Sequence, residues 1–259
     1  MMTQRHTTIL ELLSKHQRTE VALLSELLGV SQVTIRKDLD ILEERGLVRR
    51  EHGCACLNTS NDTGKRLAFN YDIKRRIAKK AAALVEEGET VLIESGSCCA
   101  LLAEELANEQ KDVTIITNSV FVANFIRHAM HTKIVLLGGY YQPESQVVVG
   151  PMTRKCGEIF FSDKLFVGTD GFMPGFGFTG KDHLRSQTVM DLAEYARDIF
   201  ILTDAEKFYH QGVLGLIRLE DVTGVFTDDR IPVGIEKLLI DNNIALHKVP
   251  ERESTFHIT

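Results

Sequence analysis

The chain has 259 residues, of which 44% are hydrophobic and 25% charged, and its formal net charge is -6. This is the usual balance of a globular protein with a sizeable core. No apolar run approaches the ~18 residues of a membrane-spanning helix, and the first residues lack a signal-peptide pattern. We therefore expect a cytoplasmic protein without a membrane partner, in which the five cysteines, an odd number, remain free thiols.

The first 57 residues have the pattern of a winged helix-turn-helix domain, in which three helices precede a hairpin. Ile35, Leu39 and Leu42 recur at i, i+4 and i+7 and predict a buried face on the third helix, for which Ser31 is a suitable N-cap. Its other face is polar and cationic in the first turns, as in a recognition helix. The predicted helices cover 4–16, 19–28 and 32–45, and the predicted strands cover 47–50 and 54–57.

Charge by itself gives this head little affinity for nucleic acid, because residues 1–57 contain eight basic and eight acidic side chains. DNA binding must depend on where the charges lie and on more than one head, so we expect a homo-oligomer, a dimer or tetramer, on double-stranded operator DNA. Arg36 or Gln32 is expected to read base edges, although Arg36 could instead pair with Asp40. Lys37, Arg49 and Arg50 are expected on phosphates. The full predicted DNA-binding set is Ser31, Gln32, Thr34, Arg36, Lys37, Arg49, Arg50 and His52.

Beyond a polar segment at 58–70, which we interpret as a linker, apolar strand-like runs alternate with helical patterns through residues 71–259. This alternation predicts an α/β domain with a mostly parallel sheet covered by helices. The expected helices are 74–86, 98–109, 119–129, 184–197 and 233–242. The expected strands are 90–94, 113–117, 133–137, 164–168, 199–203, 224–227 and 245–249.

Small, polar or charged residues follow five of these strands. Parallel α/β sheets bind ligands at the carboxyl ends of their strands, and small residues at a helix N-terminus offer free amides to an anion. The strand ends therefore predict a ligand site, although Gly138 and Gly139 alone could simply form a turn. The residues concerned are Ser95, Gly96, Ser97, Cys98, Cys99, Asn118, Gly138, Gly139, Asp170, Gly171, Asp204 and Lys207.

The segment Ser31-Gln32-Val33-Thr34-Ile35-Arg36-Lys37-Asp38-Leu39, followed by Leu42 and Gly46, resembles the signature of the DeoR family of bacterial transcriptional regulators. The wing Arg49-Arg50-Glu51-His52-Gly53-Cys54-Ala55 resembles that of the family, with Cys54 in place of a second glycine. The resemblance continues through the rest of the chain. It implies a sensor domain similar to the ribose-phosphate isomerase and CoA-transferase fold, which responds to a phosphorylated sugar or related small effector.

In this resemblance the segment 95–99 matches the phosphate loop of the family, with Cys98 and Cys99 where hydroxyl residues are common. Thiols are poorer hydrogen-bond donors, so backbone amides must carry more of the phosphate binding. Asp204 and Lys207 match a segment in which the lysine is a candidate phosphate partner, and Lys181 is placed near the effector. We expect a repressor of a carbohydrate-related operon, with no cofactor and no metal.

Two other functions are open to the sequence. A sugar-phosphate isomerase would need a second carboxylate in the loop after Asp170-Gly171, but Phe172 and Met173 follow. We therefore expect no catalytic residues. A cysteine-based redox regulator could use Cys98 and Cys99, because a helix N-terminus can lower the pKa of a thiol.

Overall fold

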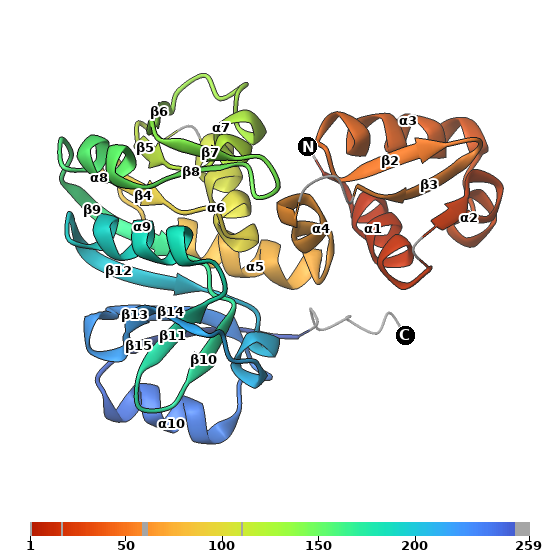
Figure 1. Cartoon of the computed structure of the whole chain (residues 1–259). Coiled ribbons are helices and arrows are strands. Elements are labelled where there is room, and N and C mark those ends of the chain that lie inside the picture. The colour runs from red at the N-terminus through yellow and green to blue at the C-terminus, as the bar shows by residue number, and fades with distance from the viewer. Residues whose placement is uncertain (1, 17, 59–61, 110, 252–259) are drawn as a thin grey trace. The chain divides into compact units, whose positions relative to one another are not determined.

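The computed structural model describes residues 2–16, 18–58, 62–109 and 111–251. The chain divides into two compact units, Met1–Asp72 and Ile73–Thr259, which are described separately (Figure 1).

Unit 1 is a winged helix-turn-helix domain. Ile9, Leu10, Leu24, Ile35 and Leu39 are completely buried and join its first three helices in one core. The three strands form an antiparallel sheet in the order β1-β3-β2. The elements are α1 (Gln4–His16), β1 (Arg18–Glu20), α2 (Val21–Leu28), α3 (Gln32–Glu44), β2 (Val48–Glu51), β3 (Cys54–Leu57) and α4 (Asp62–Ala68).

The predicted linker at 58–70 contains structure that the sequence did not indicate. Helix α4 lies there and packs on α1 and β3. Its Leu67 and Ala68 are buried, and so is Thr63. Two apolar side chains are enough to dock a two-turn helix on an existing core, but they are too few to produce a visible period in a polar segment. The boundary between the units falls inside the next helix, α5 (Tyr71–Ala82).

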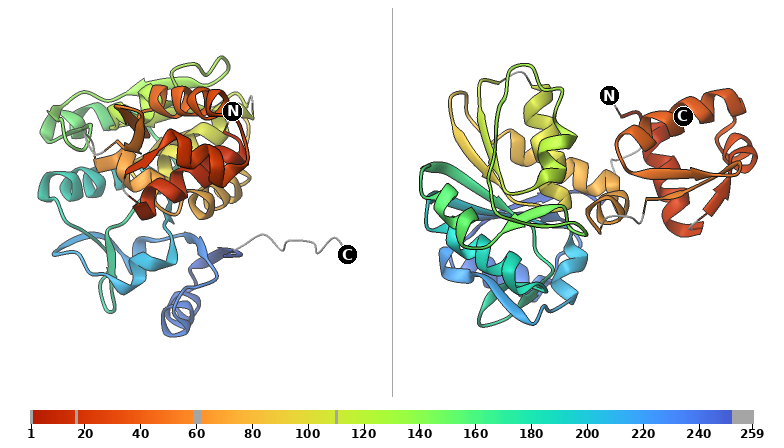
Figure 2. Two further views of the ribbon diagram at one scale, coloured as in Figure 1. Left: turned by 90° about the vertical axis from the view of Figure 1, so that its right-hand side faces the viewer. Right: turned by 45° about the horizontal axis from the view of Figure 1, so that its top comes forward.

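Unit 2 is built on a seven-stranded sheet in which every neighbouring pair is parallel, in the order β15-β14-β12-β9-β4-β5-β6 (Figure 1; two further views in Figure 2). The consecutive residues Val91, Leu92 and Ile93 of β4 are all buried, so both faces of the sheet are covered. The strands are β4 (Thr90–Ile93), β5 (Thr114–Thr117), β6 (Lys133–Leu136), β9 (Ser162–Val167), β12 (Ala196–Leu202), β14 (Gly224–Asp228) and β15 (Ala245–Val249). The expected α/β class and the seven expected strands are confirmed.

The five helices expected in unit 2 are also present, with bounds that differ from the expected ones by up to four residues. They are α5, α6 (Ser97–Asn108), α7 (Val120–Phe125), α9 (His183–Ala193) and α10 (Val233–Asp241). Helix α8 (Pro151–Gly157) and the short 3-10 helices η1 (Ala205–Tyr209) and η2 (Leu219–Asp221) were not predicted.

Two small antiparallel features were also missed, and three of their five strands have only three residues, too few to show a period. They are the hairpin of β7 (Tyr140–Gln142) with β8 (Val147–Val149), and a sheet of β10 (Gly171–Met173), β11 (Gly177–Gly180) and β13 (Leu214–Arg218). This sheet carries Phe172 and Phe178, which pack edge to face against each other and against Phe208 of η1. It therefore shares the core of the large sheet.

The strand order places the topological switch between β4 and β9. From β4 the chain first adds β5 and β6 on one side, and it then returns to add β9 on the other. Loops that leave neighbouring strands in opposite directions open a crevice at their carboxyl ends, where α/β proteins bind ligands.

Candidate functional site

Helix α3 of unit 1 presents a polar face to solvent. Ser31 Oγ accepts a hydrogen bond from the Thr34 amide at 3.2 Å and caps the helix, while Ile35, Leu39 and Leu42 are completely buried. The remaining surface of the first two turns is exposed and carries Gln32, Arg36 and Lys37. Arg36 Nη2 donates to Gln32 Oε1 at 3.3 Å, so these two candidate base readers are held side by side.

The alternative pairing of Arg36 with Asp40 does not form, because another arginine occupies Asp40. Arg50 of the wing contacts Asp40 at 2.6 Å and Glu43 at 2.7 Å. These ion pairs tie strand β2 to α3, which gives Arg50 a positioning role. Arg49 lies 3.0 Å from Glu51, with about half of its side chain exposed.

The tip of the wing is formed by two residues with left-handed backbone. His52 has φ 46° and Gly53 has φ 80°, and both are exposed. Cys54 already belongs to strand β3, so a residue other than glycine is accommodated there without strain. His52 is thus free to approach a groove, as its place in the predicted set requires.

A buried ionic cluster behind the recognition helix was not anticipated. Asp38 of α3 accepts hydrogen bonds from Arg5 Nε at 2.5 Å and from His6 Nε2 at 3.0 Å, both from α1. Burial alone would raise the pKa of Asp38, but these hydrogen bonds outweigh it and hold that pKa below its usual range. The cluster fixes α3 against α1.

In unit 2, two glycines meet at the switch point. A methyl group on Gly96 would lie 2.9 Å from Gly168 Cα, and the reverse is equally close. The β4–α6 and β9–β10 loops can approach each other in this way only without side chains. Gly96 is also the N-cap of α6 and, having no side chain, leaves the first amides of that helix uncapped.

Buried charges surround the first turn of α6. Lys74 of α5 and Asp204 after β12 are both buried, with Nζ and Oδ2 3.8 Å apart. Asp204 Oδ1 is buried and has no hydrogen-bond partner among the described residues. Burial raises the pKa of the Cys98 thiol to about 12 although the positive charges of Lys74 and Lys207 act to lower it. Both cations therefore lie within electrostatic reach of Cys98, as do the carboxylates of Asp204 and Asp228, which act to raise its pKa.

This environment argues against a redox role for the vicinal cysteines. Both are buried, and a thiol with so high a pKa contains almost no thiolate at neutral pH. The described residues also contain no group of three or more side chains suited to a metal ion.

A second polar group flanks the switch point. Glu94, at the end of β4, is buried and accepts hydrogen bonds from Ser95 Oγ and, at 3.4 Å, from the amide of Gly168. Arg185 of α9 reaches the same place, where its Nη2 lies 3.4 Å from Ser95 Oγ and 3.7 Å from Glu94 Oε1. Neither Glu94, Arg185 nor Lys74 was among the predicted site residues. Glu94 was counted as the last residue of the strand 90–94, and only the packing of α5 and α9 brings Lys74 and Arg185 to the strand ends.

Other predicted residues lie farther from the switch point. Gly138 and Gly139 end the edge strand β6, where a methyl group on Gly139 would meet Thr153, so they have a packing role. Gly171 likewise packs against the backbone of His210. Asn118 ends β5, donates to the Val148 carbonyl at 3.2 Å, and keeps a buried Oδ1 without a partner in the described structure.

The loop after β9 presents one predicted carboxylate. Asp170 Oδ2 accepts from the Lys181 amide at 3.1 Å, and the Lys181 side chain is exposed. This hydrogen bond links the β9–β10 loop to the segment before α9, and it leaves the ammonium group of Lys181 in solvent.

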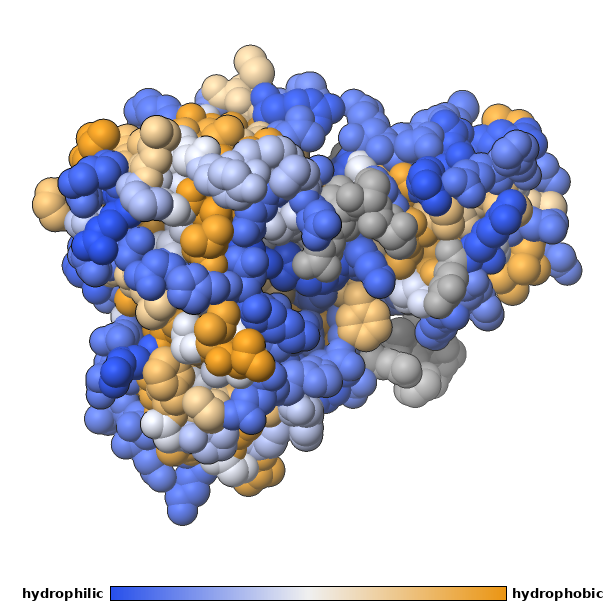
Figure 3. Space-filling view, in the orientation of Figure 1, coloured by the Kyte–Doolittle hydropathy of each residue, from blue (hydrophilic) through white to orange (hydrophobic). Residues whose placement is uncertain are grey.

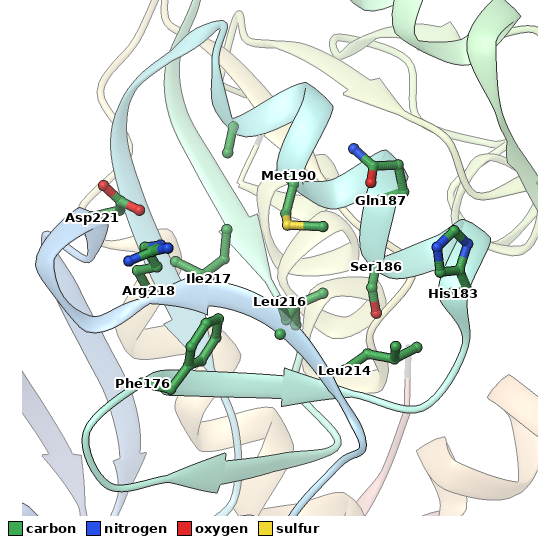
Figure 4. Close-up of a pocket in the computed structure, with 12 residues that line it drawn as sticks. Phe176, His183, Ser186, Gln187, Met190, Leu214, Leu216, Ile217, Arg218 and Asp221 are labelled. Carbon is green, nitrogen blue, oxygen red and sulfur yellow. The ribbon is translucent and has the colours of Figure 1, made fainter.

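A separate pocket of about 480 Å³ lies between α9 and β13. Figure 4 shows Met190 and Ser186 of α9 facing Leu214 and Leu216 of β13, with Phe176 beneath. None of the predicted effector residues lines it. Leu184 and Met190 of α9 are partly exposed. Figure 3 shows separate hydrophobic patches among hydrophilic residues in the orientation of Figure 1. Helix α9 thus has one side at the switch point and another at this pocket.

None of the helices in the described part of the chain combines the length and hydropathy of a bilayer span.

Comparison with known families gives two matches that together cover most of the chain. Residues 5–61 match the DeoR-like helix-turn-helix domain, and residues 69–229 match the DeoR C terminal sensor domain.

Among curated proteins, the chain is 30% identical over 244 residues to the uncharacterized HTH-type transcriptional regulator FruR of Bacillus subtilis. The aligned region covers 92% of this chain and 94% of that protein. It is 30% identical over 247 residues to the glycerol-3-phosphate regulon repressor of Escherichia coli, with coverage of 94% and 98%. It is 28% identical over 253 residues to the putative aga operon transcriptional repressor of Escherichia coli O157:H7, with coverage of 92% and 94%.

Among solved structures, ribose 5-phosphate isomerase A of Methanocaldococcus jannaschii matches 54% of this chain and 55% of its own, with 23% identity and a TM-score of 0.40.

Proposed function

The chain belongs to the DeoR family of transcriptional regulators, and from this premise we propose that it represses a carbohydrate-related operon under the control of a phosphorylated sugar or similar metabolite. It is a DNA-binding regulator and not an enzyme. Two of its relatives are named as repressors, of the aga operon and of the glycerol-3-phosphate regulon.

The DNA interface proposed here is the exposed face of α3 together with the wing. Gln32 and Arg36 lie side by side and have the donors and acceptors for base edges, with Ser31 and Thr34 at the start of the helix. Lys37, Arg49 and His52 are exposed and are assigned to the phosphate backbone. Arg50 is assigned to holding the wing against α3 through Asp40 and Glu43.

The effector site proposed here is the cluster at the switch point between β4 and β9. The observation that supports it best is the first turn of α6, where the amides have no side-chain cap and where the charges of Lys74 and Lys207 act on Cys98. Amides, helix dipole and two cations together suit a phosphate ester. The buried Asp204 Oδ1 lacks a donor, which a sugar hydroxyl would supply. Ser95, Ser97 and Asp170 complete the set as further polar groups.

The route from the effector to the DNA follows the chain itself. Lys74 lies in α5, only two residues beyond the boundary with unit 1. A phosphate group bound beside Lys74 therefore acts on the helix that continues directly into the head. The effector shifts the protein between its DNA-binding states by the difference in its affinity for them.

One experiment tests both halves of the proposal. Wild-type protein is screened by thermal shift against a panel of pentose, hexose and triose phosphates with their unphosphorylated parents. The compounds that stabilise it are then added to a complex with a duplex selected by the protein from random sequences. A ligand that binds only folded protein raises the melting temperature, by ~2.7 kcal/mol of stability at 100 times Kd.

We expect a phosphorylated compound to stabilise the protein and to change its affinity for the duplex, whereas the unphosphorylated parent does neither. Arg36→Ala, the control for specific DNA binding, should weaken the complex by ~1–3 kcal/mol and relax base preference. The proposal fails if no phosphorylated compound stabilises the protein, or if stabilisation leaves DNA affinity unchanged.

A further inference from the structure

Arg185 is placed at the switch point by its own helix. Asp182 caps α9 by accepting a hydrogen bond from the Arg185 amide at 2.8 Å, and Gln142 of the β7–β8 hairpin donates to the same carboxylate at 3.4 Å. The side chain extends to Ser95 in the β4–α6 loop and is 17% exposed. It therefore lies at the end of the proposed effector site where the β4–α6 loop begins.

The hydrogen-bonding capacity of this guanidinium is only partly used. Its Nη2 makes one long hydrogen bond, 3.4 Å to Ser95 Oγ, and its Nε is buried with no partner among the described residues. A guanidinium has five N–H donors in a planar fork that suits a two-oxygen anion. Glu94 forms an ion pair with Arg185 at 3.7 Å between Oε1 and Nη2, a distance too long for a hydrogen bond, so it does not occupy the fork.

We infer that Arg185 binds a second anionic group of the effector, a carboxylate or a second phosphate at the end opposite the phosphate held by α6. This inference rests on the proposed function and narrows its ligand class to sugar derivatives with two anionic groups. These are called doubly anionic below, and compounds with one such group are called singly anionic. Fork-like pairing with carboxylate or phosphate oxygens would satisfy the donors that the protein leaves open.

The dimensions of the loop agree with such a ligand. Ser95, which Arg185 contacts, and Cys98, on which the charges of Lys74 and Lys207 act, are three residues apart, so their Cα atoms are separated by at most ~10 Å. The carbon chain of a pentose or hexose spans a gap of this order. Glu94 then has a positioning role, since it holds Ser95 and Gly168 in place and lies beside the guanidinium.

The test uses ligand pairs that differ in one anionic group. Full-length protein is titrated by calorimetry with 6-phosphogluconate against glucose 6-phosphate, and with fructose 1,6-bisphosphate against fructose 6-phosphate. Each titration is repeated with Arg185→Met, with Arg185→Lys, and with Arg218→Met as a matched loss of an arginine at the separate α9–β13 pocket.

Wild-type protein should bind at least one doubly anionic compound roughly 10- to 100-fold more tightly than its singly anionic partner. The pair that shows this preference distinguishes a carboxylate from a second phosphate. Arg185→Met should remove the preference but keep the affinity for the singly anionic ester, which also shows that its site is folded. Arg185→Lys should restore part of the preference, and Arg218→Met should leave it intact.

The inference is overturned if wild-type protein binds both members of each pair equally, or if Arg185→Met weakens both members to the same extent. In either case a phosphorylated ligand still binds, and the proposed function stands. If none of the four compounds binds to wild-type protein while another compound with a single phosphate group from the screen does, this inference alone fails. If no phosphorylated compound binds at all, both fail.

Discussion

Asp38 lies in the recognition helix but faces the interior, where Arg5 and His6 hold it. His6 Nδ1 accepts a hydrogen bond from the Thr3 amide at 3.1 Å, so Nε2 carries the proton that is donated to Asp38. A second proton on this ring would break the bond to Thr3. At the scale of one residue, the neutral imidazole thus helps to set the angle at which α3 is presented.

Burial lowers the pKa of His6 below its ordinary value of 6.5, and the hydrogen bond to Asp38 only partly opposes this. As pH falls below about 6.5, the unfolded chain takes up a proton that the folded head does not, so stability falls with pH and levels off below the folded pKa. Above about 6.5 the residue contributes no slope. The lowered pKa of Asp38 acts only below its ordinary value of 3.8, outside this window.

We therefore expect the urea midpoint of the full chain, followed by circular dichroism, to fall between pH 7.5 and pH 5.5, and to fall less in His6→Gln. His52→Gln, at the exposed tip of the wing, is the matched control and should keep the wild-type pH response. Equal responses in wild-type protein and His6→Gln would show that His6 has the same pKa in the folded head as in the unfolded chain.

At the scale of elements, the effector site depends on two loops that pass at backbone contact. The β4–α6 loop carries Ser95 and the amides of α6, and the β9–β10 loop carries Asp170. They meet at Gly96 and Gly168. Neither loop can be moved without changing the donors that the other presents.

Gly96→Ala should separate these loops, because its methyl group would lie 2.9 Å from the Gly168 Cα, where only backbone could give way. We expect a loss of about 1–3 kcal/mol in unfolding free energy and at least about tenfold weaker effector binding. Thermal unfolding and calorimetry measure the two effects. Gly234→Ala in α10, with open space around it, is the control and should be neutral or slightly stabilising. Wild-type binding by Gly96→Ala would place the effector elsewhere.

At the scale of the whole molecule, an electrically balanced head is joined to a larger sensing unit. The head contains eight basic and eight acidic residues within 1–57, and the wing arginine Arg50 forms ion pairs with Asp40 and Glu43. One head therefore has a weak electrostatic attraction to DNA, and tight binding requires heads acting together.

We predict that sedimentation velocity of the full chain shows a dimer or tetramer at micromolar concentration. The footprint on a selected duplex should cover two half-sites related by two-fold symmetry, about one helical turn apart or a multiple of that. A monomer that binds one unsymmetrical site with full affinity would contradict this and would require another source of affinity.

The sequence by itself determined the class of each unit, because the spacing of apolar residues along the chain shows which segments are helices and which are strands. The apolar residues Ile35, Leu39 and Leu42 repeat with helical spacing, and strands such as Val91–Ile93 are continuous apolar runs, so both reappear as buried faces. The strand-end rule likewise predicts a ligand site at Gly96, Asp170 and Lys207 from the sequence alone.

The tertiary structure decided which of those strand ends belong together and what else reaches them. Strand order has no signature in a linear pattern, so the sequence could not separate Gly138 and Gly139 at the sheet edge from Gly96 and Gly168 at the switch point. Lys74, Glu94 and Arg185 enter the site from helices and a strand far apart in the chain. Periodicity records which side of an element is buried, but only packing determines which neighbour it is buried against.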